Sequence, residues 1–113
     1  MERTIKGSTA MVVRVMEELR QLDPHCGTNM VISFLKVATE PDIRVGEVQK
    51  FLGMPPTSTA RSLAKLLPIH KKGLAGLDLI DSRPDIMDKR VKRLHLTPKG
   101  ERLWLKIQHH MVA

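Results

Sequence analysis

The residue types best suited to specific contacts lie in a short segment after two adjacent prolines. We expect them on one face of a helix, away from the apolar stripe that contains Leu63 and Leu66. Small polar side chains let a helix approach another molecule closely, and an arginine can bind a guanine edge through two hydrogen bonds. An ordinary solvated face has the same composition, but the basic segment further along the chain favours base contact. The residues of this face are Pro56, Thr57, Ser58, Ala60, Arg61, Ser62 and Lys65.

A second group of candidate residues is a dense basic run nearer the C-terminus. Lysine and arginine in such a run bind phosphate oxygens and enter narrow minor grooves of DNA. Charges on an exposed strand can also serve only to prevent aggregation. We favour phosphate and minor-groove contact. The residues of this run are Lys89, Arg90, Lys92 and Arg93.

The net charge of +7 is concentrated in the C-terminal half. Residues 1–60 contain seven Lys and Arg and seven Asp and Glu, whereas residues 61–113 contain twelve Lys and Arg and five Asp and Glu. A one-sided positive excess is typical of proteins that bind a phosphate backbone. Three further lysines have phosphate contact and plain solvation as open alternatives: Lys71, Lys72 and Lys99.

The composition excludes several other classes of protein. With 113 residues, 42% hydrophobic and 27% charged, the chain has the make-up of one folded domain. We find no apolar run long enough to cross a bilayer and no signal peptide, so we expect a cytoplasmic, nucleoid-associated protein. The single cysteine, Cys26, excludes an internal disulfide, and we interpret it as structural. The histidines lack partners at metal-ligand spacing and no catalytic constellation is present, so we expect no metal, no cofactor and no enzyme activity.

Apolar residues at helical spacing predict two helices before the basic half. Ser8 or Thr9 is the expected N-cap of a helix that runs to Leu22. Thr28 or Asn29 is the expected cap of a second helix, which ends before the next proline because the residue before a proline avoids helical dihedral angles. The chain then extends briefly before the next helix begins.

A helix-turn-helix is predicted over residues 45–67. Val48, Phe51 and Leu52 fit a helix of two turns. Gly53 then provides the permissive backbone of a tight turn, and the paired prolines open a second helix. The expected buried stripe of that second helix consists of Thr59, Leu63, Leu66 and Leu67.

The hydrophobic period changes to two over residues 76–97, which predicts an antiparallel hairpin with a long tip. Leu77 and Leu79 share one side of the first strand, and Leu94 and Leu96 share one side of the second. A Thr-Pro pair then opens a closing helix over residues 98–113. The apolar faces of the first and last helices contain Val12, Val15, Met16, Leu19, Leu103, Ile107 and Met111.

A helix-turn-helix followed by a basic hairpin resembles the MarR-type winged-helix regulators. The similarity is strongest over VGEVQKFLGMPPTSTARSLAKL and DSRPDIMDKRVKRLHLTPKGERL. The second string resembles the wing signature of that family, at Asp88, Arg90, Leu96, Thr97 and Gly100.

The resemblance implies a fold and a set of roles. The fold would be α+β but mainly α, a single winged helix-turn-helix domain over residues 1–113. Its terminal helices would form a dimer interface, and their apolar faces named above are the expected dimer surface. The helix from Pro56 to Leu67 would enter the major groove, and Arg90 a minor groove. Asp88 would orient Arg61 or Arg90.

The chain departs from the family in two places. Pro68 to Gly76 forms a longer connection than usual, and the chain has few aromatic residues, so we do not expect an aromatic pocket for a small-molecule effector. We therefore expect a homodimer that binds double-stranded DNA in a sequence-specific way and regulates transcription, as a repressor. The alternatives are an accessory protein for DNA replication, partition or packaging, and a winged-helix module that binds an acidic protein.

Overall fold

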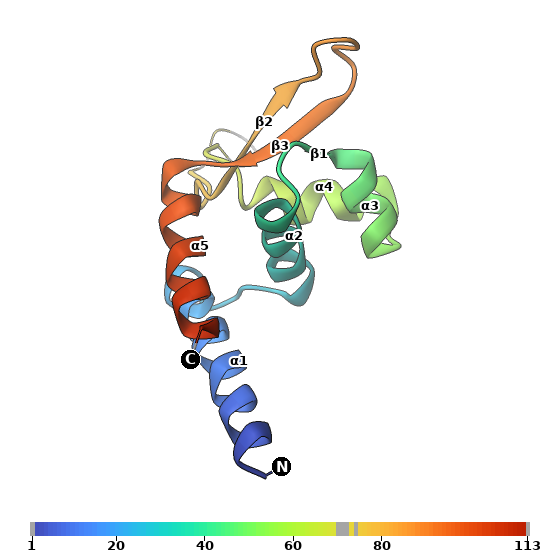
Figure 1. The fold of residues 1–113 in the computed structure, drawn as a ribbon. Helices are drawn as coiled ribbons and strands as arrows, with labels where there is room; N and C mark the ends of the chain where they lie inside the picture. Colours follow the sequence, from blue (N-terminus) through green and yellow to red (C-terminus); the bar gives the residue numbers. More distant parts are fainter. Residues whose placement is uncertain (1, 70–72, 74, 113) are drawn as a thin grey trace.

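The computed structural model describes residues 2–69, 73 and 75–112. Helices make up most of the fold, and three short strands form one antiparallel sheet whose last two strands project from the body (Figure 1). This arrangement confirms the predicted mainly α winged-helix architecture. The elements are α1 (Glu2–Leu22), α2 (Thr28–Thr39), β1 (Ile43–Arg44), α3 (Val45–Leu52), α4 (Pro56–Ala64), β2 (Ile80–Pro84), β3 (Lys92–Leu96) and α5 (Pro98–Met111).

The buried core surrounds α2, which contacts α3, α4 and β3. Phe34 on α2 and Val48 on α3 are completely buried, as is Ile107 on α5. Helix α5 packs alongside the C-terminal part of α1, and Nε2 of His110 lies 3.2 Å from a carboxylate oxygen of Glu18 across this contact. The terminal helices therefore belong to the same folding unit as the helix-turn-helix.

The expected helix starts were wrong by different amounts. Helix α1 begins at Glu2 and passes through Ser8 and Thr9, because serine and threonine lower helix stability only slightly and do not force an end. The cap of α2 is Gly27, in an extended conformation and without a side-chain cap, so neither Thr28 nor Asn29 caps the helix.

The turn between α3 and α4 explains why this sequence forms two helices there. Gly53 adopts φ 65° and its N–H donates to the carbonyls of Gln49 and Lys50, which closes α3 with a left-handed residue. Pro56 occupies the first turn of α4, where a missing N–H does no harm. Phe51 is 60% exposed and lies under the ammonium of Lys36, 4.1 Å from the ring centre, so it is not a core residue.

Helix α4 ends at Ala64, three residues before the expected end at Leu67. Thr59, Leu63 and Leu66 are buried as predicted, whereas Leu67 is only partly buried. The turn that follows uses its carbonyl groups to bind the next segment of the chain.

That next segment delays the start of the wing. Strand β2 begins at Ile80 rather than near Leu77, because the N–H groups of Leu77 and Leu79 donate to Lys65 and Leu66 instead of to a strand. Asp78 between them has φ 56°, which interrupts an extended conformation.

The sheet has the order β1-β3-β2. Ile43 pairs with Leu94, and Ser82 pairs with Leu94 from the other side, so the buried Leu94 joins the wing to the core. At its C-terminal end β3 leads into α5 through Thr97, whose hydroxyl accepts from the N–H of Gly100. A Cβ at Gly100 would lie 2.0 Å from the carbonyl oxygen of Leu79, which explains why glycine is required there.

Candidate nucleic-acid interface

The outer face of α4 is uncovered and carries mainly small and polar side chains. Arg61 and Lys65 are exposed, and within the described part of the chain neither side chain forms an ion pair or a hydrogen bond. Thr59, on the inner face, donates its hydroxyl to the carbonyl of Pro55 over 3.2 Å and so is satisfied within the helix. Pro56, Thr57 and Ala60 are also exposed, and Ser58 and Ser62 are half-buried.

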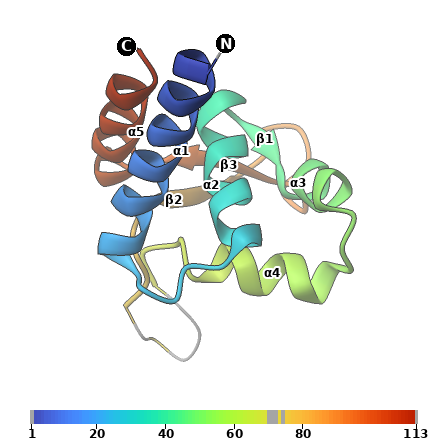
Figure 2. The ribbon, with the colours of Figure 1, turned by 90° about the horizontal axis from the view of Figure 1, so that it is seen from below.

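The packing of α4 leaves this face uncovered. Helices α2 and α3 cover its inner side, and α1 and α5 lie beyond α2, away from α4 (Figure 2). The wing projects from the end of the molecule opposite the N-terminus of α1 (Figure 1). Neither α4 nor the wing tip is therefore covered by the terminal helices.

Arg90 at the wing tip is oriented by Asp88. The Arg90 guanidinium donates through Nε and Nη2 to the two Asp88 carboxylate oxygens, over 3.1 and 3.2 Å, and the Arg90 backbone N–H donates to the same carboxylate. These hydrogen bonds lower the pKa of Asp88 below its ordinary value, so the carboxylate is ionised at neutral pH. Of the two partners that the family resemblance implied for Asp88, the structure pairs it with Arg90 and not Arg61.

Arg93 anchors the base of the tip. Its Nε forms a short ion pair with Asp85, and its Nη1 donates to the backbone carbonyl of Asp42 over 2.9 Å, which links the wing to the segment before β1. Asp85 in turn accepts hydrogen bonds from the backbone N–H groups of Met87 and Asp88. The bond from Arg93, followed by these backbone bonds, lowers the pKa of Asp85.

The remaining wing cations have open environments. Lys89 and Lys92 are exposed, and so is Arg83 on β2, which pairs in register with Arg93. Arg44, the last residue of β1, lines one depression together with Arg90 and Lys92.

Sequence reasoning missed some of these residues for identifiable reasons. Arg83 and Arg44 were missed because each is an isolated cation in the sequence. The signal for Asp85 is an aspartate in a turn-rich segment, because an aspartate there often accepts a hydrogen bond from the backbone N–H two residues on. Lys99 is half-buried at the start of α5, and Lys71 and Lys72 lie outside the described residues.

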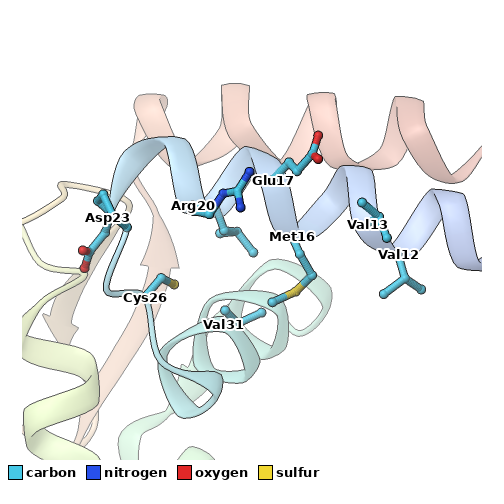
Figure 3. Close-up of a pocket in the computed structure, with 10 residues that line it drawn as sticks. Val12, Val13, Met16, Glu17, Arg20, Asp23, Cys26 and Val31 are labelled. Atoms are coloured by element: carbon cyan, nitrogen blue, oxygen red, sulfur yellow. The ribbon is translucent and has the colours of Figure 1, made fainter.

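A separate groove lies between α1 and α2, where Met16, Val31 and Cys26 face one another (Figure 3). Partial burial, and then the nearby Asp23, raise the pKa of the Cys26 thiol, which disfavours a reactive thiolate. Among the residues described, no cluster of potential metal ligands occurs, and no helix is long and apolar enough to span a membrane.

The expected dimer surface needs correction. Leu19, Leu103 and Ile107 are buried within a single chain and cannot also face a second copy. An amphipathic pattern reveals an apolar face but not what covers it. Here these residues pack α1 and α5 against each other and against the core. Among the side chains that the structure describes on these helices and in the tail after α5, the large apolar ones that remain exposed are Val12, Val13, Met16, Leu105, Met111 and Val112.

Comparison with known proteins supports the fold directly. No protein-family model and no curated protein sequence matches the chain. Among solved structures, it is similar to that of MarR, with 24% identity, a TM-score of 0.63, and coverage of 93% of this chain and 75% of that one. A MarR transcriptional regulator from Methanosarcina mazei gives 17% identity, a TM-score of 0.66, and coverage of 98% and 76%.

A third similar structure, that of MepR from S. aureus, was solved as a complex with DNA. The identity is 18%, the TM-score 0.69, and the coverage 98% of this chain and 86% of that one. At these levels of identity the similarity describes the backbone arrangement. The chain thus has the winged-helix fold of the MarR-type transcriptional regulators.

Proposed function

We propose that this protein binds double-stranded DNA sequence-specifically as a homodimer and represses transcription. The observation that carries the proposal is the open face of α4, where Arg61 lies among small side chains and has no ion pair with any of the residues that the structure describes. The wing of the same chain also carries an arginine that an aspartate orients. Similarity to the MepR–DNA complex supports the same use of the fold. The structural neighbours are regulators, and we infer that this chain is not an enzyme and works at the nucleoid in the cytoplasm.

In this proposal α4 supplies sequence readout. A helix fits the major groove of B-DNA, and short side chains such as Thr57 and Ala60 would let the backbone approach the base edges. Arg61 would then form two hydrogen bonds with a guanine. Lys65, Lys89 and Lys92 would contact phosphates, which fix the register without reading sequence.

A homodimer is supported by the exposed apolar residues of the terminal helices. On α1, Val12 and Met16 lie one turn apart, and on α5 Leu105 is 65% exposed. A two-fold dimer through these helices would present two α4 helices to successive major grooves, about 34–36 Å apart.

Light scattering tests the dimer with one variant of each terminal helix. Leu105→Glu introduces a charge on the proposed apolar surface and is expected to give monomers with an unchanged circular dichroism spectrum. Gln21→Glu adds the same charge at an exposed polar position of α1, on the opposite side of that helix from Val12 and Met16, and is expected to remain dimeric. A monomeric wild-type protein, or a Leu105→Glu variant that stays dimeric, would contradict this surface.

The proposed function is tested by selection of bound duplexes from a random library. Sequence-specific dimeric binding predicts enrichment of an inverted repeat whose half-sites are about one helical turn apart. Enrichment of no sequence at all would overturn the proposal. Mapping of the enriched sites to promoters supports repression of transcription, whereas mapping to a replication origin supports the accessory role in replication instead.

A further inference from the structure

The most exposed apolar side chains of the described chain are at the wing tip. Ile86 is 96% exposed and Met87 is 91% exposed, between the two strands of a hairpin that projects from the body (Figure 1). Two adjacent apolar residues at such a position bury nothing in the folded monomer. They therefore contribute no stability to the fold, and their chemistry suits a surface outside this chain.

The backbone that carries them is held in place. The Asp85 N–H donates to Val91 over 2.8 Å, and the Val91 N–H donates to Asp88 over 2.9 Å, across the tip. The Asp85 carboxylate also binds the N–H of Met87 itself, and Arg93 holds that carboxylate. The tip thus presents its two apolar side chains on an ordered turn, which lowers the entropy lost when they bind.

The charge around the tip indicates what the apolar pair contacts. Arg83, Lys89, Arg90 and Lys92 are exposed on the two strands and the turn. Cations on both sides of an apolar tip complement a groove with phosphates along both edges and, between them, stacked bases whose apolar faces accept a wedge at a base step. The complementarity favours DNA over an uncharged apolar partner.

We propose that Ile86 and Met87 insert between base pairs from the minor groove and kink the duplex. This inference rests on the proposed function and adds to it a mechanical role for the wing. Isoleucine and methionine are among the side chains that wedge open base steps, and such wedges bend DNA by about 20–90° toward the major groove. Flexible pyrimidine–purine steps would be preferred at the insertion point, since they unstack most easily.

The experiment measures bending of the selected duplex by energy transfer between dyes at its two ends, together with fluorescence of 2-aminopurine placed at successive adenines in each flank. The wild-type protein is expected to shorten the end-to-end distance and to brighten 2-aminopurine at one step in each flank. The double variant Ile86→Ser, Met87→Ser removes the apolar pair and is expected to lose both signals completely.

Two controls separate insertion from other effects. The variant Ile86→Leu, Met87→Leu keeps apolar volume at the tip and is expected to keep both signals. Ile69→Ser removes another exposed isoleucine, outside the wing, and is expected to change neither. Because both tip residues are exposed, their replacement leaves the core intact.

The outcomes distinguish this inference from the proposed function. Failure of the wild-type protein to bind any selected duplex overturns the proposed function. Tight binding with no bend, or an equal bend by the serine variant, overturns only the insertion. Loss of binding to anionic phospholipid vesicles by the serine variant, with DNA bending unchanged, would assign the tip to a membrane and also overturn it.

Discussion

Arg61 on α4 and Lys65 at its C-cap make no ion pair within the described part of the chain, whereas Arg90 and Arg93 in the wing are both paired with aspartates. The difference follows from how each element is supported. Helix α4 is fixed by its buried Thr59 and by packing against α2 and α3, so its outer side chains start from a rigid backbone. Its cations can therefore remain free for a ligand.

The wing has no such support beyond its base. Strand β2 is exposed from Ser82 onward, and the tip is ordered by hydrogen bonds and ion pairs rather than by apolar packing. Holding a long side chain in one rotamer costs conformational entropy. The two hydrogen bonds to the Asp88 carboxylate hold the Arg90 side chain in one rotamer before any ligand binds. The comparison indicates that α4 discriminates between DNA sequences, whereas the wing positions the protein on the DNA backbone.

The largest expected effect is on discrimination by α4. Arg61→Ala should lower affinity for the selected site by about 1–3 kcal/mol, roughly 5- to 150-fold, because a two-bond contact with guanine is lost. Affinity for random duplexes should fall much less. Binding titrations on both kinds of duplex measure the two effects.

Arg61→Lys is the matched control, because it keeps the charge and removes the planar fork. It should lose discrimination almost as Arg61→Ala does, while binding random DNA like the wild type. An equal loss on selected and random duplexes by Arg61→Ala would place Arg61 on phosphate and end the proposed division between α4 and the wing.

Replacement of an arginine in the wing should affect selected and random duplexes alike. Arg90→Ala should weaken binding to all duplexes and reduce the slope of log affinity against log salt by about one unit, since one cation no longer displaces a counterion. Titrations at several salt concentrations measure the slope, and an unchanged slope would contradict a DNA contact by Arg90.

The variant Asp88→Ala tests whether Asp88 promotes DNA binding by orienting Arg90. If Asp88 acts by orienting Arg90, its removal should lower affinity even though a negative charge near the DNA is lost. A gain in affinity on all duplexes would instead show that the carboxylate only repels phosphate.

The elements of the site were predictable because their signals are local. The Gly53 turn, the two prolines and the alternation around Leu94 each lie within a few residues of the element that they define. The partner of Arg93 was not predictable in the same way. Its contact with Asp42 spans 51 positions and exists only because β1 pairs with β3.

The tip and the terminal helices show a second limit of the sequence. The turn-rich centre of the hairpin indicates a loop, but only the fold shows that Ile86 and Met87 are left outside every core. Likewise, the stripe containing Leu103 and Ile107 correctly predicts an apolar face on the last helix. Only the folded chain shows that this face is buried inside the monomer.

The smallest expected effect concerns acid, and it tests whether the wing tip is ordered by charge. The pKa of Asp85 is lowered in the folded protein, first by the bond from Arg93. The order that this carboxylate provides is therefore fully present above its ordinary pKa of about 3.9 and is lost as the pH falls through the lower folded value. Binding at neutral pH should not change with small shifts of pH.

The amide chemical shift of Met87 measures this directly, since its N–H donates to Asp85 and its own side chain does not titrate. In the wild type this shift should titrate with a midpoint below about 3.9, and in Asp85→Asn that titration should disappear. Asp81→Asn should leave this titration intact. Among the hydrogen bonds of the described chain, the Asp81 carboxylate accepts only from the neighbouring Ser82 N–H. A wild-type midpoint at or above the ordinary value would mean that the Arg93 pair does not order the tip, and that the wing differs from α4 only in shape.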